Sequence, residues 1–151
     1  MRKFEFVSRL DNTEDLKLPE RSTKNSAGYD FYAITPMVIM PYELGKKPAM
    51  IPTGVKVKMP DDEFLMLVNR SSNPAKKNLI IPQGMGIVDS DYYNNESNEG
   101  EMFFAYYNLS EFPIGINAGE KLGQGIFMKY YVTDDDKADG ERVGGFGSTG
   151  K

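Results

Sequence analysis

Short apolar segments separated by turn-forming residues run along most of this sequence. Each segment is rich in Val, Ile, Phe, Tyr or Met and is bounded by Pro, Gly, Asn or Asp. In residues 55–59 apolar side chains alternate strictly with Lys56 and Lys58, the period of two that a half-buried strand requires. No window of helical length repeats apolar residues at helical spacing. We therefore predict strands in residues 4–7, 37–40, 53–59, 63–68, 87–88, 102–107 and 125–132.

This spacing of short strands favours a mostly-β fold, namely a jelly-roll-like barrel or sandwich. With 151 residues and 40% hydrophobic content, the chain is the right size for one domain with a sizeable core. Residues 134–140 are acidic and lack apolar anchors, as is typical of a linker. We predict a β body over residues 1–133, followed by an acidic linker and a flexible, glycine-rich C-terminal arm over residues 134–151. Residues 94–100 are a second polar stretch, predicted to be a hairpin loop or an insertion between strands.

Composition restricts the possible chemistry and partners. There is no cysteine, so disulfides and thiolate metal sites are excluded, and a cytoplasmic location is expected. The N-terminus is charged and no apolar run approaches membrane-spanning length, so neither secretion nor membrane insertion is expected. A net charge of −4 argues against a broad nucleic-acid interface. Histidine is also absent, which leaves acid–base catalysis to carboxylates, Tyr or Lys.

The C-terminal residues 141–151, here called the strap, are rich in glycine. Backbone N–H groups of such a stretch can surround a phosphate, and Arg142, Ser148 and Thr149 add one positive charge and two hydroxyls. An ordinary phosphate loop leads into a helix, but only Lys151 follows residue 150. The pattern predicts a strap that folds over an anionic ligand, and a solvated Gly/Ser terminus is the alternative.

A carboxylate follows an apolar strand in residues 84–92. Asp89 would be partly desolvated and held still at the strand end, which suits a general base that must point at one water molecule. The alternative is an Asx-type turn closing a hairpin. Tyr92 fits either a core aromatic or a ring that packs on a base or sugar.

A basic residue and two hydroxyls follow the apolar run 64–68. Ser71 and Ser72 could cap a short helix whose N-terminus binds phosphate, while the Arg70 guanidinium binds the same anion through two hydrogen bonds. A plain helix cap is the alternative.

Taken in order, these segments resemble the five motifs of the homotrimeric dUTP pyrophosphatase (dUTPase) family. The matches are AGYD at residues 27–30, RSS at 70–72, GIVDSDY at 86–92, GEKLGQ at 119–124, and Arg142 with GGFGSTG at 144–150. The third and fifth motifs are long enough to be specific, and five matches in the right order make chance a poor explanation.

The resemblance implies a β jelly roll assembled as a homotrimer, with each active site shared between subunits. It implies a dUTP diphosphatase of nucleotide metabolism that converts dUTP to dUMP and pyrophosphate. Asp89 would activate the water that attacks the α-phosphorus, and Tyr92 would pack against the deoxyribose and exclude a 2′-hydroxyl. Mg²⁺ would arrive on the triphosphate, with Asp30 reaching its water shell.

Other residues are assigned to substrate binding by the same resemblance. They are Arg70, Ser71, Ser72, Gln83, Gly86, Gln124, Arg142, Phe146, Gly147, Ser148 and Thr149. The motif-three hairpin, with Gln83 and Gly86, would read the uracil edge, and Phe146 would stack over the uracil. Closure of the strap would exclude bulk water.

The sequence departs from the family pattern at several positions. Asn69 stands where Pro or Gly is usual, and Ser72 stands where Gly is frequent. Lys121 and Gly123 replace Arg and Ala, and residues 94–100 lengthen the loop after motif three. One alternative within the same fold is dCTP deaminase. Another is a regulatory protein-binding role added to catalysis, as in some phage members, with the long loop as the candidate contact for a protein partner.

Overall fold

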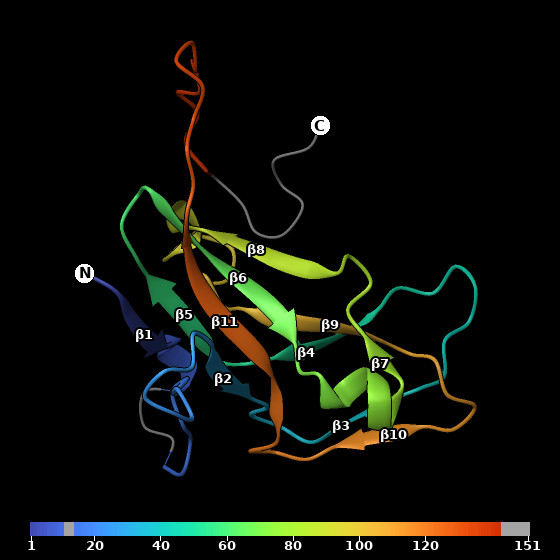
Figure 1. Cartoon of the computed structure of the whole chain (residues 1–151). Helices are drawn as coiled ribbons and strands as arrows, with labels where there is room; N and C mark the ends of the chain where they lie inside the picture. The colour runs from blue at the N-terminus through green and yellow to red at the C-terminus, as the bar shows by residue number, and fades with distance from the viewer. Residues whose placement is uncertain (11–13, 143–151) are drawn as a thin grey trace.

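The computed structural model describes residues 1–10 and 14–142 (Figure 1). The fold is mostly β and jelly-roll-like, as predicted, and its strand pairs are antiparallel. Its strands are β1 (Lys3–Phe6), β2 (Tyr29–Tyr32), β3 (Met37–Ile39), β4 (Ala49–Pro52), β5 (Val55–Lys58), β6 (Glu63–Asn69), β7 (Leu79–Ile80), β8 (Met85–Asp89), β9 (Phe103–Asn108), β10 (Ile114–Ile116) and β11 (Lys121–Lys129).

The helical residues form three short turns: η1 (Ser8–Leu10), η2 (Asn73–Lys77) and η3 (Ser90–Tyr92). Across the described ranges, none of the helices is long and apolar enough to cross a membrane.

Four sheets surround one hydrophobic core. The largest has the strand order β2-β11-β6-β8, the second has the order β4-β9-β7, and β1-β5 and β3-β10 form two-stranded sheets. The fully buried large side chains come from several of these sheets and include Phe31, Ile51, Leu65, Leu79, Met102, Phe104, Tyr106 and Leu122. Burial of this apolar surface is the main stabilising term, and it fixes which face of each strand points inward.

Each of the seven predicted segments overlaps a strand, but the sequence did not predict β2, β4, β7 or β10. These are short, and neither the two residues of β7 nor the terminal Pro52 of β4 gives a strand pattern. Strand β11 begins at Lys121, four residues before the predicted start. A Cβ at Gly123 would come within 2.2 Å of the Phe104 ring, so tight packing places glycines in this strand despite their low strand propensity.

The chain beyond β11 leaves the body and then returns to it. It runs upward in Figure 1 as the orange-to-red trace, and residues 130–141 are exposed. At residue 142 the chain is again beside the end of β8, where Arg142 pairs with Asp89. The division of the chain at residue 133 stays a prediction. The predicted site residues Phe146, Gly147, Ser148 and Thr149 lie outside the described residues.

Candidate active site

A polar pocket of about 470 Å³ lies at the end of β6, where three of the predicted motif segments meet. It is lined by Ser22, Asp30, Asn69, Arg70, Ser71, Ser72, Lys121 and Gln124. The pocket therefore combines two cationic side chains, three hydroxyls and two amides around one buried carboxylate. This set of donors suits an anion with several oxygens, such as a phosphate chain.

Asp30 organises the floor of this pocket. Only 3% of the residue is exposed, and its carboxylate accepts hydrogen bonds from Ser22 Oγ at 2.5 Å, Lys121 Nζ at 2.6 Å and Gln124 Nε2 at 3.1 Å. Burial alone would raise the pKa of Asp30, but these three hydrogen bonds outweigh it and lower the pKa below the usual aspartate value. Asp30 therefore stays ionised and holds the lysine and the amide in fixed positions.

Arg70 and the two serines form one wall of the pocket. Arg70 Nη1 donates to the Lys121 carbonyl at 3.3 Å, so part of the guanidinium is tied to the edge of the sheet. A short helix does begin at Asn73, and Ser72 occupies its N-cap position. The Ser72 side chain makes no capping hydrogen bond, so the prediction that this hydroxyl caps the helix is wrong. The buried Asn73 amide donates to Asn69 Oδ1 at 2.8 Å and anchors the backbone that carries Arg70.

Sequence reasoning missed three lining residues of this pocket: Ser22, Asn69 and Lys121. Lys121 and Gln124 are three positions apart, and a regular strand would direct them to opposite faces. A register irregularity in β11 between these two residues lets both reach Asp30. Ser22 comes from the loop before β2, and no pattern in that loop points to it. For Lys121, the sequence signal that could have identified it was its position inside the fourth motif, residues 119–124.

A second group of predicted site residues lies at the end of β8. Asp89 is the last residue of that strand, and 51% of its side chain is exposed. Tyr92 follows in η3 and is only 3% exposed, and burial raises the pKa of its phenol. The sequence left open whether Tyr92 is a core residue or a ligand contact, and its ring packs in the core with one side next to Arg142.

Arg142 covers this second group. Its Nη2 lies 2.5 Å from Asp89 Oδ2 and its Nε lies 2.7 Å from Asp91 Oδ1. The guanidinium carbon is 5.7 Å from the centre of the Tyr92 ring, in cation–π range. Arg142 was predicted to bind phosphate, but in this structure it occupies the position beside the candidate base. Arg142 thus occupies one of the two carboxylate oxygens of Asp89.

Gln83 and Gly86 lie on the hairpin that leads into β8. Gln83 is exposed, and Gly86 pairs with Leu67 of β6. A Cβ at Gly86 would come within 3.2 Å of the Leu67 Cβ, so sheet packing also favours glycine there. Both residues line a shallow apolar pocket of about 210 Å³, whose other walls include Met50 and Phe103. An apolar slot beside exposed backbone is compatible with a planar base.

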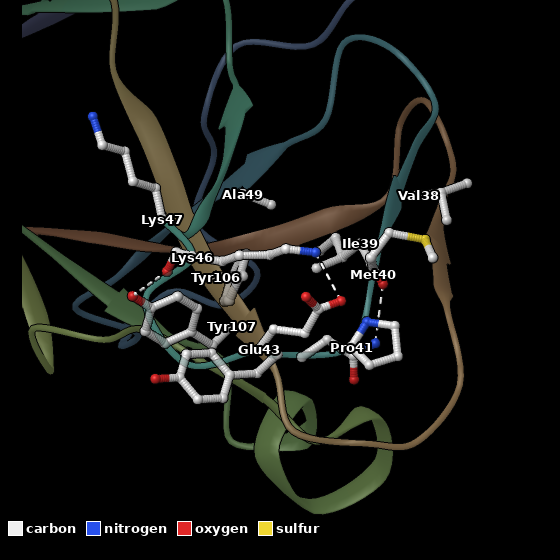
Figure 2. Close-up of a pocket in the computed structure, with 12 residues that line it drawn as sticks. Val38, Ile39, Met40, Pro41, Glu43, Lys46, Lys47, Ala49, Tyr106 and Tyr107 are labelled. Carbon is white, nitrogen blue, oxygen red and sulfur yellow. Dashed lines mark hydrogen bonds and ion pairs between the residues drawn. The ribbon is translucent and has the colours of Figure 1, made fainter.

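A further pocket of about 210 Å³ lies between β3 and β9, away from both groups (Figure 2). Its polar side chains already pair with neighbouring groups: Lys46 Nζ lies 2.7 Å from Glu43 Oε1, and the Tyr107 hydroxyl donates to the Lys46 carbonyl at 3.1 Å. None of the predicted site residues within the described ranges lines this pocket. We therefore exclude it as the active site.

The two groups of site residues lie at opposite ends of β6. In the β6–β8 register, Asp89 is opposite Phe64, whereas Arg70 is six positions further along the strand direction. At about 3.4 Å per residue this separation is roughly 20 Å. One chain alone therefore cannot place its Asp89 against a phosphate that its own Arg70 holds.

Comparison with known proteins identifies the family to which this arrangement belongs. The profile of the dUTPase family matches residues 14–150. The deoxyuridine 5′-triphosphate nucleotidohydrolase of Lactococcus lactis subsp. lactis is 43% identical over 99% of this chain and 98% of its own length. The chain belongs to the dUTPase family. A second relative of the same name, from Wolbachia pipientis wMel, is 32% identical over 96% of this chain and 94% of its own length.

Solved structures of dUTPases share the fold. The dUTPase from Streptococcus mutans superposes with a TM-score of 0.79 at 38% identity, over 87% of this chain and 98% of that one. The dUTPase from phage phi11 of S. aureus has a TM-score of 0.72 at 22% identity, over 93% of this chain and 97% of that one, and this likeness concerns the fold alone. The resemblance found in the five motifs is thus confirmed at the level of the family.

Proposed function

We propose that this member of the dUTPase family hydrolyses dUTP to dUMP and pyrophosphate, with Asp89 as the general base. Water attacks the α-phosphorus, its proton passes to the Asp89 carboxylate, and the bond from the α-phosphorus to the bridging oxygen of pyrophosphate breaks. The observation that carries this proposal is the polar pocket, where Arg70, Lys121 and Gln124 lie together with Ser71 and Ser72. These groups would stabilise negative charge that develops on the phosphate oxygens.

The nucleoside half of the substrate would lie at the end of β8. Tyr92 would pack against the deoxyribose and exclude a 2′-hydroxyl, while the hairpin with Gln83 and Gly86 would read the uracil edge. Arg142 would leave Asp89 when the substrate binds and turn to the phosphates. The strap would then close, with Phe146 over the uracil and Gly147, Ser148 and Thr149 around the phosphates.

The roughly 20 Å between Arg70 and Asp89 within one chain supports a site shared between chains. We infer a homotrimer in which the pocket of one subunit faces the Asp89 and Tyr92 of a neighbour. The linker over residues 134–140 would give the strap the reach to close over a site built by other subunits. This arrangement assigns a role to the exposed segment 130–141.

The described residues fit a Mg²⁺ ion that enters with the triphosphate. In the described part of the chain, no three Asp, Glu, His or Cys side chains gather into a metal cage. Asp30 lines the pocket, and its Oδ1 accepts one protein hydrogen bond, which leaves an acceptor position for a metal-bound water. A phage dUTPase from S. aureus has been described with a structural Mg(II) ion. Mg²⁺ bound here would neutralise charge on the triphosphate.

The function is tested by pyrophosphate release from dUTP, UTP, dCTP and dTTP with Mg²⁺ and with excess EDTA. We expect release from dUTP alone, and strong loss of release when EDTA removes Mg²⁺. Comparable release from UTP would contradict the role of Tyr92. Deamination of dCTP would favour the dCTP deaminase alternative instead.

Shared sites predict that two inactive variants restore each other's activity. Arg70→Ala and Asp89→Asn trimers should each be inactive, because every site lacks one essential group. When equal amounts are unfolded, mixed and refolded together, about a quarter of the sites receive an intact Arg70 and an intact Asp89 from different chains. Pyrophosphate release should therefore recover to about a quarter of the wild-type rate. A mixture that stays inactive, or a wild-type protein that is monomeric in light scattering at micromolar concentration, would refute the shared site.

A regulatory protein-binding role would add to catalysis and would leave its residues in place. The candidate contact for such a partner was the loop over residues 94–100. This loop packs on its own chain, with Asn95 buried and Glu99 paired with Lys56. No observation on the described residues favours a partner there.

A further inference from the structure

The long loop after motif three folds back against Tyr92. It joins η3 to β9, which belong to different parts of the fold, so it is an insertion between sheets and not a hairpin loop. The polar side chains of residues 94–100 bond mainly to one another and to Tyr92. The loop therefore has a defined structure that the mechanism above does not use.

Asn98 holds the far end of the Tyr92 ring. Its Nδ2 donates to the Tyr92 hydroxyl at 2.7 Å, and that hydroxyl donates to the Glu101 carbonyl at 3.0 Å. The phenol oxygen thus accepts one hydrogen bond and donates another, in a nearly fully buried site. Two such bonds hold the hydroxyl end of a ring that also packs in the hydrophobic core.

Asn95 holds Asn98 in turn. Asn95 Oδ1 accepts hydrogen bonds from the Ser97 backbone N–H at 3.0 Å and from the Asn98 backbone N–H at 3.2 Å. Its Nδ2 donates to the Tyr92 carbonyl at 2.9 Å and to Asn98 Oδ1 at 2.9 Å. The loop is therefore attached to both the backbone and the side chain of Tyr92.

The end of the loop is anchored to the body. Glu99 accepts hydrogen bonds from Ser8 Oγ at 2.5 Å and Lys56 Nζ at 3.3 Å. Gly100 has a φ of +85°, and a Cβ there would come within 2.6 Å of the Tyr92 carbonyl oxygen. Only glycine lets the chain close this tightly on Tyr92. The anchors make the loop a rigid support and not a free surface.

We propose that Asn98 is a positioning residue that fixes the Tyr92 ring and thereby sets discrimination between deoxyribose and ribose nucleotides. This inference rests on the proposed function, in which Tyr92 excludes the 2′-hydroxyl. A small tilt of the Tyr92 ring would make room for the 2′-hydroxyl oxygen, and the ring would then no longer exclude a ribonucleotide. The bond to Asn98 opposes that tilt, and the inserted loop is the element that supplies it.

The test compares kcat/KM for dUTP and UTP in wild-type protein and in the Asn98→Asp variant. Asp has the same shape and keeps the acceptor oxygen for Asn95 and the Gly100 N–H. It loses the Nδ2 group that donates to the Tyr92 hydroxyl and to the Glu101 carbonyl. We expect the dUTP/UTP selectivity to fall by about tenfold or more, the scale typical of small steric differences in a pocket. Glu96→Ala, on an exposed side chain of the same loop, is the matched control and should leave selectivity unchanged.

A double-mutant cycle with Tyr92→Phe separates positioning from general destabilisation. If Asn98 acts through the phenol, Asn98→Asp should change selectivity little further in the Tyr92→Phe background. Thermal unfolding midpoints report any loss of fold separately from selectivity. Unchanged selectivity in folded Asn98→Asp protein, or full additivity with Tyr92→Phe, would overturn the proposal.

Failure of the proposed positioning role of Asn98 can be distinguished experimentally from failure of the proposed function. Wild-type protein that fails to hydrolyse dUTP would contradict the function. The ratio of Kd values for dUDP and UDP, measured by calorimetry, reads sugar discrimination without hydrolysis. If discrimination is lost in Asn98→Asp, the Kd for dUDP divided by the Kd for UDP rises toward one. Such a rise supports the positioning role even then, and an unchanged ratio opposes it.

Discussion

Replacement of Asp89 by Asn is expected to lower kcat for pyrophosphate release from dUTP by about 10²–10⁴-fold, the usual contribution of a general base. Asn matches the shape of Asp but cannot take up the proton of the attacking water. Because the amide keeps the size of the side chain, nucleotide binding should be retained. Steady-state release at saturating dUTP gives kcat, and calorimetry with a non-hydrolysable dUTP analogue gives the affinity.

Asp91→Asn is the matched control for this change. Asp91 lies two residues further on, has a similarly exposed side chain, and shares the guanidinium of Arg142 with Asp89. If Asp89 is the base, Asp91→Asn should retain at least about ten times more activity than Asp89→Asn. Equal losses would mean that the ion pairs with Arg142, and not proton transfer, explain the effect of Asp89→Asn. A fully active Asp89→Asn protein would refute the assignment of the base.

Truncation after Gly140 is expected to abolish turnover while the folded trimer stays intact. It removes Arg142 and the rest of the strap, which we propose closes the site and contacts the phosphates, and such groups are worth about 10²–10³-fold in rate. The fold should survive because residues 130–141 are exposed and contribute little to the core. The only described ion pairs that are lost, from Arg142 to Asp89 and Asp91, involve half-exposed carboxylates, and such pairs contribute little to stability.

Activity, circular dichroism and light scattering on the truncated protein measure these expectations separately. A chain that lacks only Lys151 is the control and should be fully active, because none of the predicted ligand groups of the strap is removed. Loss of the trimer on truncation after Gly140 would count against the strap and assign residues 141–151 to assembly. Full turnover without the strap would show that closure is not needed.

Local pattern was enough to predict much of the sheet. The strict alternation in residues 55–59 and the apolar run in residues 64–68 both correspond to strands, because the period of side chains along a strand is a local property. The motifs also predicted some residues of the site: Arg70 and Gln124, both assigned to phosphate binding, line the polar pocket. Strands without such a pattern, including Ala49–Pro52, were missed.

The sequence by itself determined the fold class, the family and the residue types of the site. Strand period, turn residues and motifs can all be recognised from residues that are near one another in the sequence. Only the tertiary structure decided how these parts are combined. It places Asp89 opposite Phe64 and hence far from Arg70, it brings Lys121 beside Asp30 through a strand irregularity, and it folds the inserted loop onto Tyr92. Register, bulges and loop packing depend on contacts between distant segments, which no local pattern encodes.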